Sequence, residues 1–421
     1  MTLQLDLEDQ LAAFLASDPD AIGDPYPLYA RLRETAGNYW HERGPAHFVT
    51  GYEHVHWCLQ NAGPISQGGY SRGTRARAIE AALSEPDRRL LHEVFAFESL
   101  YVSRSDGERH TRLRKIAHRA FTPRRIALLE QSVARYTQEL TAGWEDRDEI
   151  DVMAELASQL PTMVIADLLA VPQSDRTLIR TWADTISRNR GGANVDALRD
   201  GHAAIQEFRA YVAELVADKR RNGDGTELVL ALLEAAEDGD RLSSEELVAM
   251  FVVLLFAGTE TTTNLIAGGL RQLLLHRPQW ERLTADPELV PGAVEELLRY
   301  DSPVQFLLKV AAEDLEIAGK PVAEGETVIL GVGSANRDPQ AFPEPDKLDV
   351  ARKPNRHLAL GFGPHFCLGA SLARLEGRTV FGTLAERFPK LDFAVDPATL
   401  GWQGNAMLRG LKALPVAPNG A

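Results

Sequence analysis

The sequence predicts a mainly α-helical protein with a small β region, folded as one unit over residues 1–421. Helical periodicity covers most of the chain, and the short apolar runs typical of strands occur in only a few places. No Ser/Gly-rich linker or internal repeat divides the chain into two halves. With 44% hydrophobic residues, the chain can bury a large core.

The first predicted helix is an amphipathic stretch that Asp24-Pro25-Tyr26-Pro27 opens and that runs through Leu32. Residues Gly63–Asp106 mix Gly, Arg and aromatic residues, which predicts an irregular segment. Helical periodicity returns over Glu108–Trp144, with an interruption at Thr122-Pro123. The other predicted helices are Val152–Leu169, Gln173–Arg188, Val195–Lys219, Thr226–Ala236, Pro291–Tyr300 and Ala370–Phe388.

The longest predicted helix begins at Ser243, where Ser243-Ser244-Glu245-Glu246 has the form of a capping box. It extends to about His276, and Arg277-Pro278 ends it. It is apolar nearly all round at first, so it is expected to cross the protein interior. Its apolar run, Leu247–Gly258, is shorter than the roughly 20 residues that span a bilayer. We therefore expect no membrane association.

The β region is predicted from short apolar runs separated by turn signals. A Pro-rich coil, Asp338–Asn355, follows these runs and leads into a glycine-rich loop. The predicted strands are Ala46–Thr50, Val304–Ala312, Leu315–Ile317 and Thr327–Val332.

Composition excludes several classes of function. The formal net charge of −15 is unfavourable for general nucleic-acid binding. The two cysteines, Cys58 and Cys367, are too few for a zinc finger or an iron–sulfur site. Residues Met1–Asp20 are acidic and lack the basic and apolar regions of a signal peptide. A cytoplasmic location is therefore expected.

The most informative segment is the loop His357–Gly369, where Cys367 stands among glycines directly before a helix. Glycines let the backbone approach a flat ligand closely, and a helix N-terminus favours a thiolate. Such a thiolate suits an axial ligand to haem iron. Taken alone, a single cysteine is more often an inert buried thiol. The flanking residues decide between the two.

This segment closely resembles the haem-binding loop of the cytochrome P450 family, in which Phe-Gly-x-Gly-x-His/Arg-x-Cys-x-Gly surrounds the ligand. The resemblance extends over nearly the full chain and implies the triangular helical prism of that family, with haem b bound by Cys367. One position departs from the pattern: Leu360 stands where the family usually has Phe, which puts the redox tuning of the sulfur in doubt. The matching residues are Gly361, Gly363, His365, Cys367 and Gly369.

A polar cluster, Ala257-Gly258-Thr259-Glu260-Thr261-Thr262, interrupts the apolar helix. A Gly followed by hydroxyl groups can open a local bulge in which a small molecule and water fit. The alternative is a helix that simply meets solvent at Glu260. The sequence resembles the family's oxygen-activation motif, which implies that Thr261 supports oxygen activation with Glu260 as the neighbouring acid. Ala257 and Gly258 would then border the cofactor.

Further residues match the family pattern. Glu296 and Arg299 resemble its structural Glu-x-x-Arg pair, for which the coil supplies only Lys347 where an Arg is common. The resemblance also implies a set of partners for the haem propionates: His110, Arg114, Lys309 and His365. Lys309 replaces the usual Arg.

The resemblance implies insertion of one oxygen atom from O₂ into a small organic substrate, by hydroxylation or O-dealkylation. The residues expected to face the substrate are apolar, so the substrate is expected to be apolar, aromatic compounds included. These residues are Val253, Phe256, Ala257, Val304 and Leu307, with Phe95, Phe97, Leu100 and Tyr101 covering the pocket.

Two alternatives remain. One is a haem-thiolate enzyme of other chemistry, such as a peroxygenase or a coupling or nitrating enzyme. The other is a non-catalytic P450-like protein that only recruits a partner; retention of Cys367 and the oxygen motif disfavours it.

Electrons are expected from a separate protein, because the haem unit accounts for the whole chain. A basic segment stands out on this acidic protein, and it favours an acidic ferredoxin with an NAD(P)H-dependent reductase as the partner. Its residues are Arg109, Arg112, Arg114, Lys115, Arg119, Arg124 and Arg125.

Overall fold

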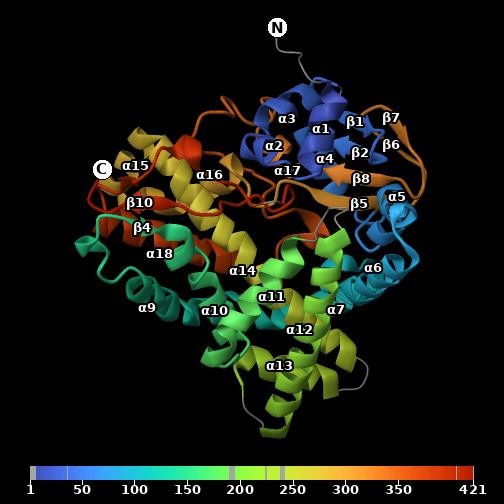
Figure 1. The fold of residues 1–421 in the computed structure, drawn as a ribbon, viewed down its shortest axis with the longest axis horizontal. Helices are drawn as coiled ribbons and strands as arrows, with labels where there is room; N and C mark the ends of the chain where they lie inside the picture. Colours follow the sequence, from blue (N-terminus) through green and yellow to red (C-terminus); the bar gives the residue numbers. More distant parts are fainter. Residues whose placement is uncertain are drawn as a thin grey trace.

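The computed structural model describes residues 6–35, 37–188, 195–222, 225–237, 242–403 and 405–420. Most of them lie in helices, and the strands are short, which confirms the predicted mainly α architecture. The N-terminal helices lie beside the largest sheet at one end of the molecule (Figure 1). One large hydrophobic cluster draws residues from Leu11 to Val416, so both ends of the chain contribute to the same core.

The helices of the first half are α1 (Leu7–Leu15), α2 (Pro19–Gly23), α3 (Tyr26–Arg33), α4 (Tyr52–Gln60), α5 (Thr74–Ala82), α6 (Glu85–Glu98), α7 (Gly107–Ala120), α8 (Pro123–Leu128), α9 (Glu130–Leu140), α10 (Leu160–Leu168) and α11 (Arg176–Arg188). The remaining helices are α12 (Val195–Asn222), α13 (Glu227–Glu237), α14 (Ser244–Leu275), α15 (Arg277–Ala285), α16 (Val290–Tyr300), α17 (Val332–Ala335) and α18 (Ala370–Arg387).

The largest sheet has five strands in the order β1 (Asn38–His41), β2 (Ala46–Val49), β8 (Thr327–Leu330), β5 (Leu307–Ala311) and β3 (Ile65–Ser66). Strands β2 and β8 are parallel, and the other pairs are antiparallel. The register places Lys309 opposite Val328. Two small antiparallel sheets complete the β region: β4 (Ile150–Asp151), β10 (Pro415–Ala417) and β9 (Asp392–Phe393), and the pair β6 (Leu315–Ile317) and β7 (Lys320–Val322).

Helix α14 crosses the centre of the molecule, as predicted (Figure 1). Its capping box forms: the Ser243 hydroxyl accepts from the Glu246 amide at 3.1 Å, and the Glu246 carboxylate accepts from the Ser243 amide at 3.0 Å. By length and composition α14 could cross a membrane, but 83% of its apolar window is buried inside the protein. We therefore describe it as a core helix.

The prediction of an irregular segment over Gly63–Asp106 is wrong, because α5 and α6 occupy much of it. Helix α6 has a conventional start: the Ser84 hydroxyl accepts from the Asp87 amide. Its buried residues Leu91 and Val94 are three apart, which is the helical spacing that the mixed composition obscured. Elsewhere, the single helix predicted over 152–169 is divided into a π-helical turn, Met153–Ala157, and α10.

Candidate active site

The cysteine loop before α18 is shaped by two glycines in left-handed conformations, Gly361 at φ +72° and Gly363 at φ +68°. A side chain at Gly363 would meet the Leu59 carbonyl oxygen at 2.9 Å, so this position requires glycine. The Cys367 amide donates to the Leu360 carbonyl at 2.8 Å, which closes the loop. The loop geometry thus presents Cys367 directly before the first turn of α18.

The two cysteines lie in different environments. Cys58 is fully buried in α4, and burial raises the pKa of its thiol to about 12. Cys367 is partly exposed. Burial also raises the pKa of the Cys367 thiol, but a hydrogen bond from the Gly369 backbone and the positive charges of Arg114 and Arg374 act in the opposite direction. Cys367 is therefore the better thiolate ligand.

On α14, Ala257 is exposed although the helix around it is mostly buried. Thr261 lies one turn further, and its hydroxyl donates to the Ala257 carbonyl at 2.9 Å. Exposure in the middle of a core helix indicates a hollow on this face. The expected bulge does not form: α14 remains α-helical, and its hydroxyl groups bond back to carbonyls of the preceding turn.

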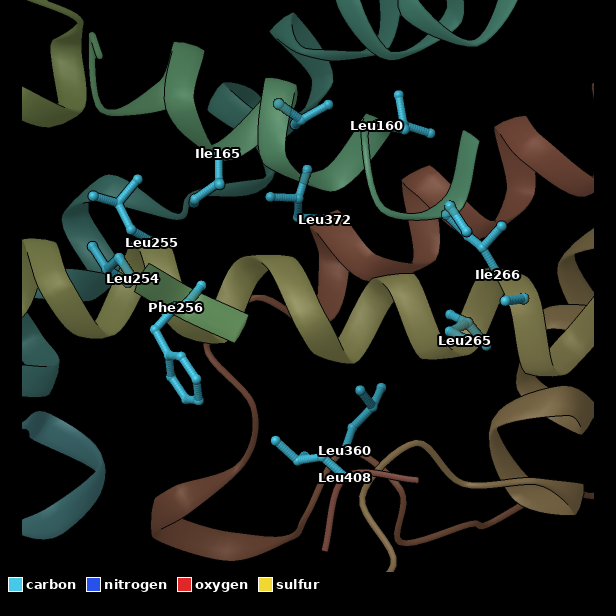
Figure 2. Close-up of a cluster of buried hydrophobic side chains, with 14 of the residues drawn as sticks. Leu160, Ile165, Leu254, Leu255, Phe256, Leu265, Ile266, Leu360, Leu372 and Leu408 are labelled. Carbon is cyan, nitrogen blue, oxygen red and sulfur yellow. The ribbon is translucent and has the colours of Figure 1, made fainter. Parts of the chain in front are cut away.

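Glu260 and Gly258 face other neighbours. Glu260 is buried and lines a cavity of about 400 Å³ with Thr259 and Thr263; Thr261 is not among its lining residues. A side chain at Gly258 would meet Ile165 of α10 at 3.0 Å, so this glycine permits close helix packing (Figure 2). Of the predicted motif residues, the structure thus brings together Ala257 and Thr261.

Three buried donors converge near the cysteine loop. The rings of His110 and His365 lie 4.0 Å apart between centroids, and the Lys309 side chain is fully buried. The buried nitrogens His110 Nε2, His365 Nε2 and Lys309 Nζ have no hydrogen-bond partner among the described residues. His365 Nε2 does lie 3.4 Å from Asp106 Oδ1, which is a long contact. Burial lowers the pKa of Lys309 to about 8.

Unpartnered buried cations and donors are unfavourable, so this cluster fits an anionic ligand group. Propionates of a haem would supply two carboxylates. Arg114, the fourth predicted propionate partner, donates to the Phe366 carbonyl in the cysteine loop and so lies near the same site. A haem fits three features of this site: the position of Cys367, the hollow beside Ala257 and the buried donors near the cysteine loop.

The Glu296–Arg299 pair is fully buried and forms two hydrogen bonds of 2.8 Å. A third side chain, that of Arg352, joins this pair: its Nε lies 3.1 Å from Glu296 Oε1. The Lys347 side chain instead points to Glu344, and Lys347 contributes only its backbone carbonyl. The Pro-rich coil therefore supplies the expected Arg, five residues beyond the position considered in the sequence.

A second network, which the sequence did not reveal, connects α16, α18 and the cysteine loop. Glu295 accepts two hydrogen bonds from Arg374, at 2.7 and 2.8 Å, and lies 3.1 Å from His357. Burial opposes ionisation of Glu295, yet these partners lower its pKa to about 2. Arg374, seven residues after Cys367, was the available signal in the sequence, but an Arg on a helix is too common to single out.

The residues predicted to contact the substrate differ in burial and in surroundings. Val253 and Phe256 are buried, whereas Val304 and Leu307 are half-buried. Figure 2 shows Phe256 pointing from α14 to the side where Leu360 and Leu408 lie. Among the residues predicted to cover the pocket, Phe95 lines a cavity, while Phe97 and Tyr101 pack edge to face in the core, 5.5 Å apart. Neighbours of the predicted residues, Leu308 and Met407, line that cavity too.

Comparison with known proteins shows the family of this chain. The sequence model of the family described as Cytochrome P450 matches residues 195–397. The chain is 40% identical to the polyketide biosynthesis cytochrome P450 PksS of Bacillus subtilis over 81% of this chain and 84% of that protein. It is 39% identical to the cytochrome P450 monooxygenase PikC of Streptomyces venezuelae over 94% and 92% of the two chains.

A solved relative has the same fold. The structure of the myxobacterial cytochrome P450 CYP267B1 in complex with myristic acid matches with a TM-score of 0.85 and 34% identity, over 96% of this chain and 98% of that one. Identity at this level over nearly the whole length of both chains shows common family membership as well as a shared fold. This chain belongs to the cytochrome P450 family, as a monooxygenase related to those of bacteria.

Proposed function

We propose that residues 1–421 act as one haem domain that binds haem b with the Cys367 thiolate as the axial ligand. The observation that carries this proposal is the cluster of buried donors beside the cysteine loop. His110 Nε2 and Lys309 Nζ have no hydrogen-bond partner among the described residues, and His365 Nε2 has only its 3.4 Å contact with Asp106. When bound, the haem supplies the oxidative chemistry that inserts one oxygen atom from O₂ into an organic substrate. The polypeptide supplies the thiolate, the propionate contacts and the orientation of the substrate.

Thr261 is proposed to handle a proton on the substrate side of α14. Its hydroxyl is held by the Ala257 carbonyl at the exposed part of the helix. A hydroxyl can donate and accept at once, so it can pass a proton from solvent or from a neighbouring acid. Glu260 is adjacent in sequence but faces the cavity with Thr259 and Thr263, so its contribution would require a route around the helix.

The substrate is proposed to be a small, largely apolar molecule, hydroxylated or O-dealkylated. The cavity that contains Phe95 is lined mostly by apolar side chains, which supports this class. The relatives' own ligands differ in kind, since PksS is described for polyketide biosynthesis and CYP267B1 holds myristic acid. The family therefore leaves the substrate open.

Electrons are proposed to come from an acidic ferredoxin with an NAD(P)H-dependent reductase, in the cytoplasm. Only part of the basic segment on α7 is available to dock an acidic partner. Arg109 and Arg112 contact the Glu246 carboxylate, at 3.3 and 2.7 Å, while Lys115 is exposed. The side chains of Arg119, Arg124 and Arg125 lie outside the described residues. Lys115→Glu should slow reduction by ferredoxin and flatten its salt dependence.

The haem assignment is tested by the CO complex of the reduced protein. Cys367→Ser should abolish the red-shifted Soret band that a thiolate ligand produces, whereas Cys58→Ser should keep it. Loss of the band in the Cys58 variant and retention in the Cys367 variant would overturn the assignment. NADH-driven turnover with ferredoxin then separates a monooxygenase from a peroxide-driven enzyme and from a non-catalytic partner protein.

A further inference from the structure

The cavity that contains Phe95 also contains a buried cation, Arg104, which none of the roles described above uses. Arg104 is 8% exposed and lines this cavity of about 90 Å³, hereafter the Arg104 cavity. Its guanidinium lies over the Tyr70 ring, 3.7 Å from the centroid. Among the described residues, the hydrogen bond recorded for Arg104 is that of its backbone amide to the Tyr101 carbonyl, and its guanidinium contacts the Tyr70 ring. Because a guanidinium has five donors, one that lines a cavity without a protein acceptor favours an anionic ligand there.

The one carboxylate that lines the Arg104 cavity is engaged elsewhere. Glu98 is buried and accepts a hydrogen bond from the Tyr70 hydroxyl, at the edge of the ring. Arg104 covers the face of the same ring. Tyr70 thus contacts Glu98 through its hydroxyl and Arg104 through the face of its ring. Phe95 packs edge to face against the same ring, with the two centroids 5.4 Å apart.

The remaining polar lining adds positive charge. Arg75 also lines the Arg104 cavity, so two guanidinium groups face one carboxylate there. Arg75 extends towards Gly44, since a side chain at Gly44 would meet Arg75 Nη1 at 2.5 Å. Thr327 and Gly201 also line the cavity, and the remaining wall is apolar: Ala76, Ile79, Leu91, Val94, Phe95, Ile186, Ile205, Leu308 and Met407.

We propose that the Arg104 cavity binds the carboxylate end of an amphipathic substrate whose apolar remainder is the part oxidised. The proposal rests on the monooxygenase function proposed above and narrows its substrate class to apolar acids. A carboxylate matches the planar fork of Arg104 in two parallel hydrogen bonds. The cavity has room for a few water-sized groups, so it fits one end of a ligand. The remainder would extend past Leu308 and Met407, which adjoin the predicted substrate residue Leu307 and the Val304–Leu408 bridge.

The test compares dodecanoic acid with dodecanol, which share the apolar chain and differ in the charged group. Binding to the haem-loaded protein is measured by the spin-state shift and, independently, by calorimetry. Wild type should bind the acid more tightly than the alcohol. Arg104→Gln should weaken binding of the acid by about tenfold to a hundredfold and leave the alcohol unchanged, because only the acid loses a charge-assisted contact. Arg104→Lys should bind the acid with an affinity between those of wild type and Arg104→Gln.

Arg88→Gln is the matched control, since Arg88 is exposed on α6 and does not line the cavity. Equal binding of acid and alcohol by wild type, or equal loss of both in Arg104→Gln, would overturn the proposal. Loss of haem in Arg104→Gln would also overturn it, because Arg104 would then serve a propionate. Failure of the proposed function is distinguishable: the CO spectrum would lack the thiolate band, whereas calorimetry would still report whether the acid depends on Arg104.

Discussion

Arg352 Nε lies 3.1 Å from Oε1 of Glu296, whose side chain is fully buried between α16 and the Pro-rich coil. Arg352 also donates to three backbone carbonyls of the coil, those of Pro343, Glu344 and Lys347. One side chain thus ties the Glu296–Arg299 pair to the segment that leads into the cysteine loop.

Arg352→Gln should destabilise the fold by about 2–4 kcal/mol, because a buried carboxylate loses one of its charged partners. Chemical denaturation with the haem band as the signal measures this. Lys347→Gln is the control and should change stability by less than about 0.5 kcal/mol, since that side chain is 61% exposed. Equal effects in the two variants would show that Arg352 is not the third member of the network.

Helices with a strong local pattern could be predicted from the sequence. Contacts between side chains far apart in the sequence could not, because they depend on the path of the folded chain. Ser243-x-x-Glu246 and the apolar run after it predicted α14 correctly, because a capping box and helical periodicity are local signals. In contrast, Arg352 and Lys347 are both basic residues in a coil, and only the path of the coil decides which one reaches Glu296. For the same reason, Glu260 could not be placed from its neighbour Thr261, because consecutive helical residues point in directions about 100° apart.

Lys309 should contribute to haem retention more than to folding. Its ammonium group is fully buried and lacks a partner among the described residues, so a propionate would relieve an unfavourable charge. Lys309→Met should release haem faster to a haem-scavenging globin, whereas Lys309→Arg should retain it. Lys320→Met, on the half-exposed strand β7, is the control. Unchanged haem release in Lys309→Met would remove Lys309 from the site.

Leu360 should matter for the electronic properties of the sulfur. Its carbonyl accepts the Cys367 amide, and its side chain is 9% exposed and points towards α14 (Figure 2). Leu360→Phe places an aromatic ring beside the thiolate, so the reduction potential should shift. Leu360→Met, of similar volume, should leave the potential nearly unchanged. A large loss of thermal stability in Leu360→Phe without a shift in potential would contradict this role.

Glu295 should make the fold sensitive to acid. Its partners Arg374 and His357 hold its folded pKa at about 2, below the ordinary value of 4.5. The resulting stability is therefore present above pH 4.5 and is lost as the pH falls towards 2. Glu295→Gln should be less stable than wild type by about 1 kcal/mol at pH 7, allowing for solvent screening, and the difference should shrink below pH 4.5. Glu288→Gln, at an exposed position of the same region, should show no such trend.

Thr261 should govern whether electrons are used productively. Its hydroxyl is bonded to the Ala257 carbonyl at the exposed part of α14, whereas Thr262 is 4% exposed and packs in the core. Thr261→Ala should therefore bind haem and substrate normally but consume NADH with release of peroxide instead of product, because the proton donor is lost. Thr261→Ser keeps the hydroxyl and should restore most of the coupling. The measurement is the ratio of product formed to NADH consumed. Normal coupling in Thr261→Ala together with uncoupling in Thr262→Ala would transfer the role to the neighbouring residue.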